Sequence, residues 1–505
     1  MQPTEARTSA PPLEHTYRET FPGLAHPAQP DIPQGTRLAW LNENLAQELG
    51  LDSGWLRSEA GITWMTGRGG APTYALAYSG YQFGQLSPVL GDGRAHMVGE
   101  LVVPGAGGSH PHRLGPTRVD LHLKGSGRTS FSRPGSDGKA PLSAVWREAV
   151  IGESLHALGV PTSRALAVFE TGEKVQRRAP EPEPAGLVLR VAASHLRVGT
   201  FQFAQYHCPQ EVRGQLVDYA LARHYPHLVA GETSGERALS LLRAVAQSQA
   251  SLVTSWQALG FVHGVLNTDN VTISGEAIDF GPCAFIDVFE RDKVFSSIDR
   301  QGRYAYNHQP GITAWNLSRF AETLLDLIDP KDPNRAIHLA TGVISEYEED
   351  VVGRQIEAFA AKLGLELHGV GEDVRANVGR LGQQTLGLLE REGLDFTGFF
   401  RALAEGSCLL TGDLGLRWQE QVGALRLATG TSPERARELM ALHNPVYIPR
   451  NLALEAALRQ VEAGDREPIL RILDVVSRPF ERQAGCEDLE GAPPESRFFT
   501  SFCGT

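Results

Sequence analysis

The 505-residue chain is poor in cysteine and has no long apolar run. Its cysteines form no Cys-x-x-Cys pair; they are Cys208, Cys283, Cys408, Cys486 and Cys503. This scatter argues against a disulfide scaffold and fits a reducing compartment, so we expect a cytoplasmic protein. No stretch of 18 apolar residues is present, so we expect no membrane partner, and the N-terminus lacks the apolar core of a secretory signal.

Basic residues are in the minority. The chain has 47 Lys and Arg against 59 Asp and Glu, which gives a formal net charge of −12. A general nucleic-acid binder needs basic faces that displace counterions, so we expect no nucleic-acid partner. No Walker-type Gly-Lys-Ser/Thr loop occurs either, which excludes the common P-loop phosphate site.

Apolar periodicity predicts how the long chain is organised. Val119 to Lys124 alternates apolar and polar residues, as a half-buried strand does, and residues 141–158 follow helical spacing up to Gly159. Helical spacing dominates after about residue 210. We expect four regions: an N-terminal arm with a short helix (1–80), a lobe of strands plus one helix (81–200), a helical lobe with a loop-rich centre (201–345) and a helical C-terminal region (346–505).

One segment carries most of the chemical information. It runs from His263 to Asn270 with the sequence His-Gly-Val-Leu-Asn-Thr-Asp-Asn, and Asp279-Phe280-Gly281 begins nine residues after Asn270. Protein kinases have this layout in their catalytic and metal-binding loops. The kinase Asp that accepts the substrate proton is replaced here by Val265, which cannot take a proton. We therefore expect a metal–nucleotide site that lacks the ordinary base.

Two residues in this segment are candidate metal ligands. Residues 271–278 read as a tight hairpin, which would bring Asn270 and Asp279 together at its open end. One amide oxygen and one carboxylate form a common oxygen set for Mg²⁺, with phosphates and waters completing it. Asp269 is either a loop carboxylate that caps a turn or a displaced base that compensates for Val265. An ordinary turn after a strand is the alternative for Asp279-Phe280-Gly281.

Cations that would face phosphates lie upstream. Lys124 ends the alternating strand, and Glu148 lies beside the apolar face of the next helix, where it would be an odd unpaired carboxylate. Kinases fix their nucleotide lysine with such a strand–helix ion pair. Arg190 and Arg197 are either surface residues or a clamp on a polyphosphate. Residues 91–94, Gly-Asp-Gly-Arg, are a weak phosphate-cradle signal.

Together these stretches resemble the selenoprotein O family, whose members are kinase-like protein adenylyltransferases, and this chain resembles its cysteine-containing bacterial type. The resemblance covers about residue 35 to the C-terminus and implies an α+β, bilobal, protein-kinase-like fold with an N-terminal arm and an additional helical C-terminal region. The matching stretches include Gln82-Phe83-Gly84, Leu90-Gly91-Asp92-Gly93-Arg94, Leu123-Lys124-Gly125-Ser126-Gly127, Arg147-Glu148, Leu189-Arg190-Val191-Ala192, Ser194-His195-Leu196-Arg197, residues 263–270, Asp279-Phe280-Gly281-Pro282, Gln301-Gly302-Arg303-Tyr304 and Ile448-Pro449-Arg450-Asn451.

The resemblance implies that ATP binds with its orientation reversed and that AMP is transferred to Ser, Thr or Tyr hydroxyls of protein substrates, with release of pyrophosphate. It also implies a role for each matching residue. The nucleotide would contact Gly91, Gly93, Arg94, Lys124, Asp137, Gly138, Arg190, Arg197 and Asp279; Mg²⁺ or Mn²⁺ would bind Asn270 and Asp279; Asp269 would accept the proton; and Glu148 would position Lys124.

The chain departs from the family pattern around the loop that carries Asp137 and Gly138, at Tyr81, Ser130, Ser136 and Lys139. The family also has a selenocysteine or cysteine near its C-terminus, and Cys503 stands at that place. Two other functions remain open. One is a non-catalytic nucleotide-binding pseudokinase, and the other is a thiol-redox regulator that uses Cys503.

Overall fold

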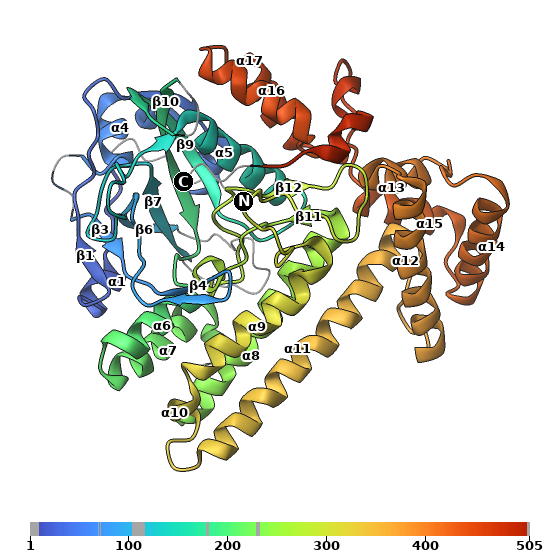
Figure 1. Ribbon diagram of the computed structural model, residues 1–505, viewed down its shortest axis with the longest axis horizontal. Coiled ribbons are helices and arrows are strands. Elements are labelled where there is room, and N and C mark those ends of the chain that lie inside the picture. Colours follow the sequence, from blue (N-terminus) through green and yellow to red (C-terminus); the bar gives the residue numbers. More distant parts are fainter. Residues whose placement is uncertain are drawn as a thin grey trace.

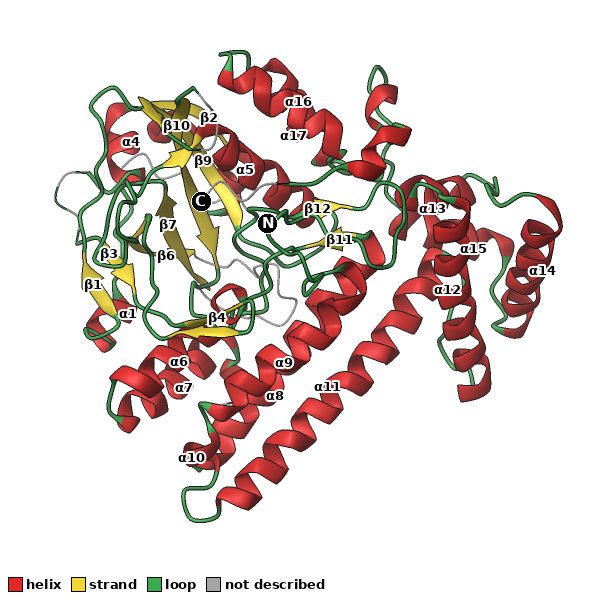
Figure 2. Ribbon diagram, viewed as in Figure 1, coloured by secondary structure: helices red, strands yellow, loops and turns green. Residues whose placement is uncertain are grey.

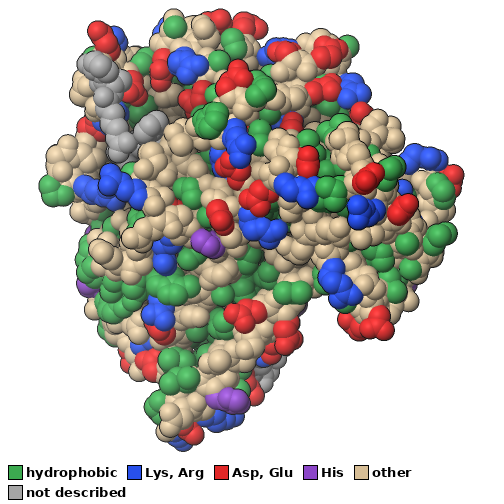
Figure 3. All heavy atoms as spheres, turned by 45° about the vertical axis from the view of Figure 1, so that its right-hand side comes forward, with side chains coloured by type: hydrophobic (Ala, Val, Ile, Leu, Met, Phe, Trp, Pro, Cys, Tyr) green, Lys and Arg blue, Asp and Glu red, His purple; other side chains and the backbone are tan. Residues whose placement is uncertain are grey.

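The computed structural model describes residues 10–68, 70, 72–103, 117–177, 181–228 and 233–501. It is a mixed α+β structure in which the strands gather on one side and long helices extend from it (Figures 1 and 2). Acidic and basic side chains are mingled over the face in Figure 3, with no continuous basic patch on that face. Among the described residues, no helix combines the length and apolarity needed to cross a membrane.

An eight-stranded sheet holds most of the strands, and its paired strands are antiparallel, in the order β1-β3-β6-β7-β10-β9-β2 with β8 beside β10. The strands are β1 Ala25–Pro27, β2 Arg37–Leu41, β3 Tyr74–Leu76, β6 Ala95–Val103, β7 Thr117–Lys124, β8 Ala140–Pro141, β9 Arg164–Val175 and β10 Glu183–Ala192. Two further pairs are β4 Gly80–Gln82 with β5 Gln85–Ser87, and β11 Phe261–Val262 with β12 Ala284–Phe285.

The register of this sheet places two predicted site residues on one face. Lys124 pairs with Val188, and His122 pairs with Arg190. Paired residues on neighbouring strands share a face, and so do residues two apart on one strand. Lys124 and Arg190 therefore project from the same face of β7 and β10.

Helix α5 (Leu142–Ala157) packs against β9 and β10 on the face that bears Lys124 and Arg190. Its stripe of Val145, Trp146, Ala149 and Val150 is buried, as the helical spacing predicted. The chain turns at Gly159, whose φ of 80° favours a residue without a side chain. The burial of this stripe fixes the rotation of α5 and directs Glu148 inward.

The first 80 residues contribute more regular structure than the predicted arm with one short helix. Strands β1, β2 and β3 belong to the eight-stranded sheet, and four short helices are present. These are α1 Thr16–Thr20, α2 Glu43–Glu48, α3 Ser53–Leu56 and α4 Glu59–Met65. The predicted short helix corresponds to α2, which starts only at Glu43 because Trp40 in β2 pairs with Val168 of β9 and Asn42 caps the helix. Short edge strands lack the length over which alternation can be recognised.

Helices form most of the rest of the chain, apart from the loop-rich stretch with β11 and β12. The long α8 starts at a Thr233–Glu236 capping box and ends at Gly260, and α11 lies alongside it (Figure 1). The helices are α6 Val198–His207, α7 Gln210–His224, α8 Ser234–Leu259, α9 Gln309–Glu322, α10 Leu325–Ile328, α11 Pro333–Lys362, α12 Glu372–Glu392, α13 Phe396–Ala404, α14 Gly412–Ala428, α15 Pro433–His443, α16 Asn451–Glu462 and α17 Glu467–Val476. The last two return to the sheet and pack on α5.

Candidate nucleotide site

Three cations converge on the carboxylate of Asp279. Lys124 Nζ lies 3.1 Å and Arg190 Nη2 lies 2.5 Å from its Oδ1, while Arg197 Nη1 lies 3.7 Å from its Oδ2. Burial of Asp279 opposes its ionisation, but Arg190, Lys124 and Arg197 outweigh that effect and hold its pKa well below the usual value. Asp279 is therefore a permanent anion at neutral pH, as a metal-binding carboxylate must be.

Glu148 lies behind these cations on α5. Its Oε2 accepts a hydrogen bond from Lys124 Nζ at 2.7 Å, and its Oε1 forms an ion pair with Arg190 Nε. Burial alone would raise the pKa of Glu148, but Arg190 and Lys124 lower it to about 2. The strand–helix ion pair predicted from the sequence is thus present, and Glu148 fixes Arg190 as well as Lys124.

Asp269 lies in a single turn of 3₁₀ helix, η2 (Thr268–Asn270), and is only 7% exposed. Its Oδ1 is buried without a hydrogen-bond partner among the described residues, and its Oδ2 receives only a long bond of 3.4 Å from the Gln82 amide. Burial raises the pKa of Asp269 to about 6. A carboxylate with a free oxygen and a pKa near neutrality has the properties of a general base.

Gly80 makes room for that carboxylate. A Cβ at position 80 would lie 2.4 Å from Asp269 Oδ1, closer than atoms can approach. Arg197 holds the same loop from the other side, because its Nη1 donates to the backbone oxygen of Asp269 at 3.1 Å. Arg197 therefore contacts both the loop of Asp269 and the carboxylate of Asp279, which places these two acids in one site.

The other predicted metal ligand, Asn270, uses its amide nitrogen to donate to Val265 O at 2.9 Å. Its amide oxygen is then the atom left for a cation. The predicted hairpin over 271–278 turns at Gly275, but its arms bond to neighbouring segments: Thr272 pairs with Arg197 and Ala277 with Thr162. The loop is thus tied to the segment that carries Arg197 and to the segment between α5 and β9, which a local hairpin signal does not reveal.

The glycine loop at residues 91–94 borders the same cluster through Asp92, which sequence reasoning did not single out. Asp92 accepts bonds from Leu76 N (3.1 Å) and His122 Nε2 (3.0 Å), and its Oδ1 lies 3.6 Å from Arg197 Nη2. Gly91 has a φ of 124° and lies under the Phe131 ring, where a Cβ would collide with the ring carbons. Gly93 and Arg94 follow it directly and lead into β6.

Asp137 and Gly138 contact other residues than those of the cation cluster. Arg177 donates to both carboxylate oxygens of Asp137, at 2.7 and 2.8 Å, and this bond lowers the pKa of Asp137. Gly138 packs against the backbone of Gly127 with a φ of 71°. Within the described part of the chain, no recorded contact joins Asp137 to the cation cluster. Cys503 lies outside the described residues.

A second group of hydrogen bonds joins the loop that carries Asp269 to strand β4 and the residue that follows it. Tyr81 N donates to Thr268 Oγ1 at 2.8 Å, and Phe83 N donates to Tyr304 OH at 3.1 Å. The Tyr304 hydroxyl in turn donates to the Asn267 side chain. Both Gln82-Phe83-Gly84 and Gln301-Gly302-Arg303-Tyr304 match the family pattern, but no local signal in either motif indicates that the two meet.

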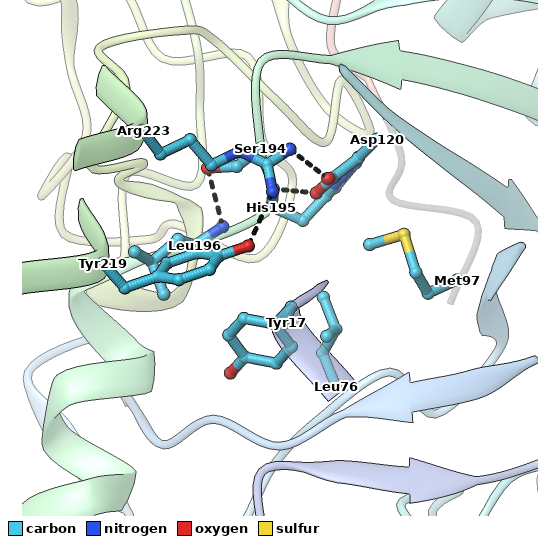
Figure 4. Close-up of a pocket in the computed structure, with 9 residues that line it drawn as sticks. All are labelled: Tyr17, Leu76, Met97, Asp120, Ser194, His195, Leu196, Tyr219 and Arg223. Carbon is cyan, nitrogen blue, oxygen red and sulfur yellow. Dashed lines mark hydrogen bonds and ion pairs between the residues drawn. The ribbon is translucent and has the colours of Figure 1, made fainter. Parts of the chain in front are cut away.

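A small cavity of about 10 Å³ lies further along the same face of the sheet (Figure 4), with room for about one water molecule. Asp120 dominates its polar lining, because it accepts bonds from His195 and from Arg223 Nη2 at 2.5 Å. Burial lowers the pKa of His195 to about 4, so this imidazole is neutral at physiological pH. The cavity is too small for a nucleotide and belongs to the packed interior.

The donor set of Asp279 and Asn270 fits a hard divalent cation that shares its coordination with phosphates. Asp279 supplies a charged oxygen and Asn270 supplies an amide oxygen, both of the type that Mg²⁺ and Mn²⁺ prefer. No group of three or more His, Cys, Asp or Glu that could hold a metal ion occurs in the described ranges. Two protein ligands leave most of an octahedron to phosphate oxygens and water.

Comparisons with known proteins agree with this chemistry. A sequence model described as "Protein adenylyltransferase SelO" matches residues 19–413. Proteins named protein nucleotidyltransferase YdiU are similar along nearly their whole length. The protein from Rhodococcus jostii is 45% identical, covering 99% of this chain and 95% of its own; that from Geobacillus kaustophilus is 45% identical, covering 94% and 95%; and that from Chromobacterium violaceum is 43% identical, covering 95% and 99%.

Proposed function

The chain belongs to the SelO family of protein adenylyltransferases, as its motifs predicted, and we propose that it transfers AMP from ATP to hydroxyl groups of other proteins. One observation carries the assignment of the site. Lys124, Arg190 and Arg197 converge on Asp279, and Arg197 also holds the loop of the unpaired carboxylate Asp269. Cations, a metal-binding acid and a base thus meet in one place.

The cations are the proposed phosphate ligands. Lys124 and Arg190 are nearly buried, and their partners are the anions Glu148 and Asp279. A triphosphate that enters the site replaces Asp279 as a partner of these cations, while Glu148 keeps both side chains aimed at the cleft. The exchange of one anion for another avoids leaving buried cations without a partner, which costs several kcal/mol per ion. Gly91, Gly93 and Arg94 are proposed to border the phosphates, with Asp137 and Gly138 at the nucleotide's outer edge.

Asn270 and Asp279 are the proposed ligands of Mg²⁺ or Mn²⁺. When bound, the metal neutralises charge on the phosphates as the leaving group departs. The protein's part is alignment. Before nucleotide binds, contacts with Lys124 and Arg190 hold Asp279 in place, and Asn270 is held by its bond to Val265 O.

The proposed reaction is an in-line displacement at the α-phosphorus. The acceptor hydroxyl oxygen bonds to that phosphorus, the bond from the phosphorus to the oxygen bridging to the β-phosphate breaks, and pyrophosphate leaves with the electron pair. The proton of the hydroxyl passes to Asp269, whose Oδ1 has no other partner among the described residues. Val265 excludes the base position that kinases use, so Asp269 is the acid left on this loop.

The finer architecture belongs to the same proposal. A protein-kinase-like pair of lobes accounts for a lysine strand, a carboxylate helix and a metal loop that meet in one cleft. We place the strand-rich lobe at 81–200 and the helical lobe at 201–345, with the N-terminal segment 1–80 and the C-terminal region 346–505 attached to them. The Lys124–Glu148 ion pair of 2.7 Å supports this arrangement.

The direct test is to supply ATP labelled with phosphorus-32 at either the α or the γ position. The full chain is incubated with a bacterial lysate as the source of acceptors, with Asp279→Ala as the control variant. We expect α-labelled ATP to transfer its label to protein, and γ-labelled ATP to transfer none. Protein labelling from the γ position alone would identify a kinase and reject AMP transfer.

A further inference from the structure

Helix α16 (Asn451–Glu462) begins at the segment that follows the metal-binding loop, although the two lie far apart in sequence. Asn451 Nδ2 donates to Phe285 O and to Asp287 Oδ2, both at 2.9 Å. Arg450 Nη1 donates to Asp287 Oδ1 at 3.0 Å, and both Arg450 and Asn451 are almost fully buried. The motif Ile448-Pro449-Arg450-Asn451 therefore fixes the start of α16 to strand β12, five residues after Asp279.

One turn later, α16 reaches helix α5. Glu455 forms an ion pair with Arg147, whose residue is only 8% exposed and stands next to Glu148 in the sequence. Apolar contacts reinforce the pair, because Leu454 and Leu458 of α16 share a buried cluster with Val145 and Ile151 of α5. Figure 1 shows α16 and α17 beside α5, at the edge of the sheet.

The N-terminal half of α16 thus touches both halves of the proposed site. Its start is bonded to the segment downstream of Asp279, and its first turn is bonded to the helix that carries Glu148. In kinases, the position of the equivalent carboxylate helix decides whether the lysine–glutamate ion pair forms. A helix that ties α5 to the metal-loop segment would set the spacing between Lys124 and Asp279.

We propose that α16 is a strut between α5 and the metal-loop segment, and that Arg147 and Glu455 are positioning residues that act through Glu148 on Lys124. The inference rests on the proposed nucleotide site. Arg147 and Glu148 project from different faces of α5, so Arg147 reaches α16 while Glu148 reaches the cations. Loss of the ion pair frees α5 to rotate or shift, and the lysine then meets the phosphates in a poorer geometry.

The test uses the full chain with Mg²⁺-ATP. We expect Arg147→Ala and Glu455→Ala each to raise the KM for ATP by about five- to tenfold, with a smaller change in kcat, because the effect passes through the phosphate-binding lysine. The charge-swapped variant Arg147→Glu with Glu455→Arg should return the KM to within about twofold of the wild-type value. Glu455→Gln keeps the shape of the side chain and serves if an alanine variant does not fold.

The matched control is Arg466→Ala. Arg466 joins the same C-terminal helices to β9 through Glu170, at 2.6 Å, but Glu170 has no recorded contact with the cluster at Asp279 in the described chain. We expect Arg466→Ala to leave the KM for ATP within about twofold of wild type. The proposal would be overturned if Arg466→Ala raised the KM for ATP as much as Arg147→Ala does, or if the charge-swapped variant did not lower the raised KM.

Hydrogen exchange of the α5 amides, measured without nucleotide, separates the strut from the proposed function. Exchange in α5 should be faster in Arg147→Ala than in Arg466→Ala, whatever the chain does with ATP. If Lys124→Ala leaves ATP affinity unchanged while α5 still exchanges faster in Arg147→Ala, the proposed function fails and the strut stands. Wild-type exchange in α5 together with a wild-type KM in both alanine variants would reject the strut.

Discussion

Replacement of Asp269 by Asn should abolish transfer and also stabilise the protein. The carboxylate is 7% exposed, and its Oδ1 has no hydrogen-bond partner among the described residues. Burial disfavours the charged form and raises the pKa of Asp269 from 3.8 to about 6, although Arg197 and the weak bond from Gln82 act in the opposite direction. The charged carboxylate of Asp269 therefore lowers the free energy of unfolding, although its charge is what the proposed proton transfer requires.

The size of that cost follows from linkage. Because the folded-state pKa is the higher one, the native state binds more protons than the unfolded state between about pH 4 and 6, and stability increases as the pH falls through that window. At about pH 7.5 the ionised carboxylate costs about 3 kcal/mol, at roughly 1.4 kcal/mol for each tenfold shift in proton affinity. At about pH 5 the cost is about half as large.

The assay is thermal unfolding of wild type and Asp269→Asn in EDTA, without nucleotide, at both pH values. We expect the variant to unfold at the higher temperature at about pH 7.5 and its advantage to shrink at about pH 5. Asp92→Asn is the control, for which we expect the opposite change in stability. Burial opposes ionisation of Asp92, but His122 and Arg197 hold its pKa at about 2, so its loss should destabilise the protein. The reasoning would be refuted if Asp269→Asn were less stable than wild type at about pH 7.5, or if its gain in stability did not depend on pH.

Three further outcomes are expected. Lys124→Ala should raise the KM for ATP by about tenfold or more, measured by initial rates, since a charge-assisted bond contributes about 1.5–3 kcal/mol. Asp279→Ala should reduce transfer below about 1% of wild type and remove the Mg²⁺ dependence of ATP binding in calorimetry; retained activity with ordinary metal dependence would contradict the assignment. Gly80→Ala should lower transfer by about 100-fold with ATP affinity unchanged, because its Cβ would lie 2.4 Å from Asp269 Oδ1; a drop in ATP affinity of the same size would contradict this.

The parts of the site that could be predicted are those with local signals. The alternating strand that ends at Lys124 and the helical stripe around Glu148 each have a clear period, and their meeting in an ion pair of 2.7 Å follows from the unpaired carboxylate beside an apolar face. The loop of Asn270 and Asp279 was recognised by spacing. The roles of these residues in catalysis stay predictions.

The parts that could not be predicted depend on contacts between distant segments. Nothing near Glu455 indicates that it meets Arg147, because about 300 residues separate them and the pair forms only when the C-terminal helices return to the sheet. The burial of Asp269 beside Gly80 is likewise a tertiary effect. The short strands β1 and β3 show no readable alternation, so the sequence predicts only an arm for the N-terminal segment.

The charge balance of the cleft accounts for the loss of the usual kinase base. Lys124, Arg190 and Arg197 all contact the carboxylate of Asp279, so three cations lie together in the site. Phosphoryl-type transfer depends mainly on alignment and charge stabilisation, and a base contributes less. In the proposed reaction the buried cations stabilise the departing pyrophosphate, so valine at position 265 is compatible with transfer provided that another acid lies near the acceptor oxygen. Asp269 meets that requirement because burial, the largest influence on it, raises its pKa to about 6.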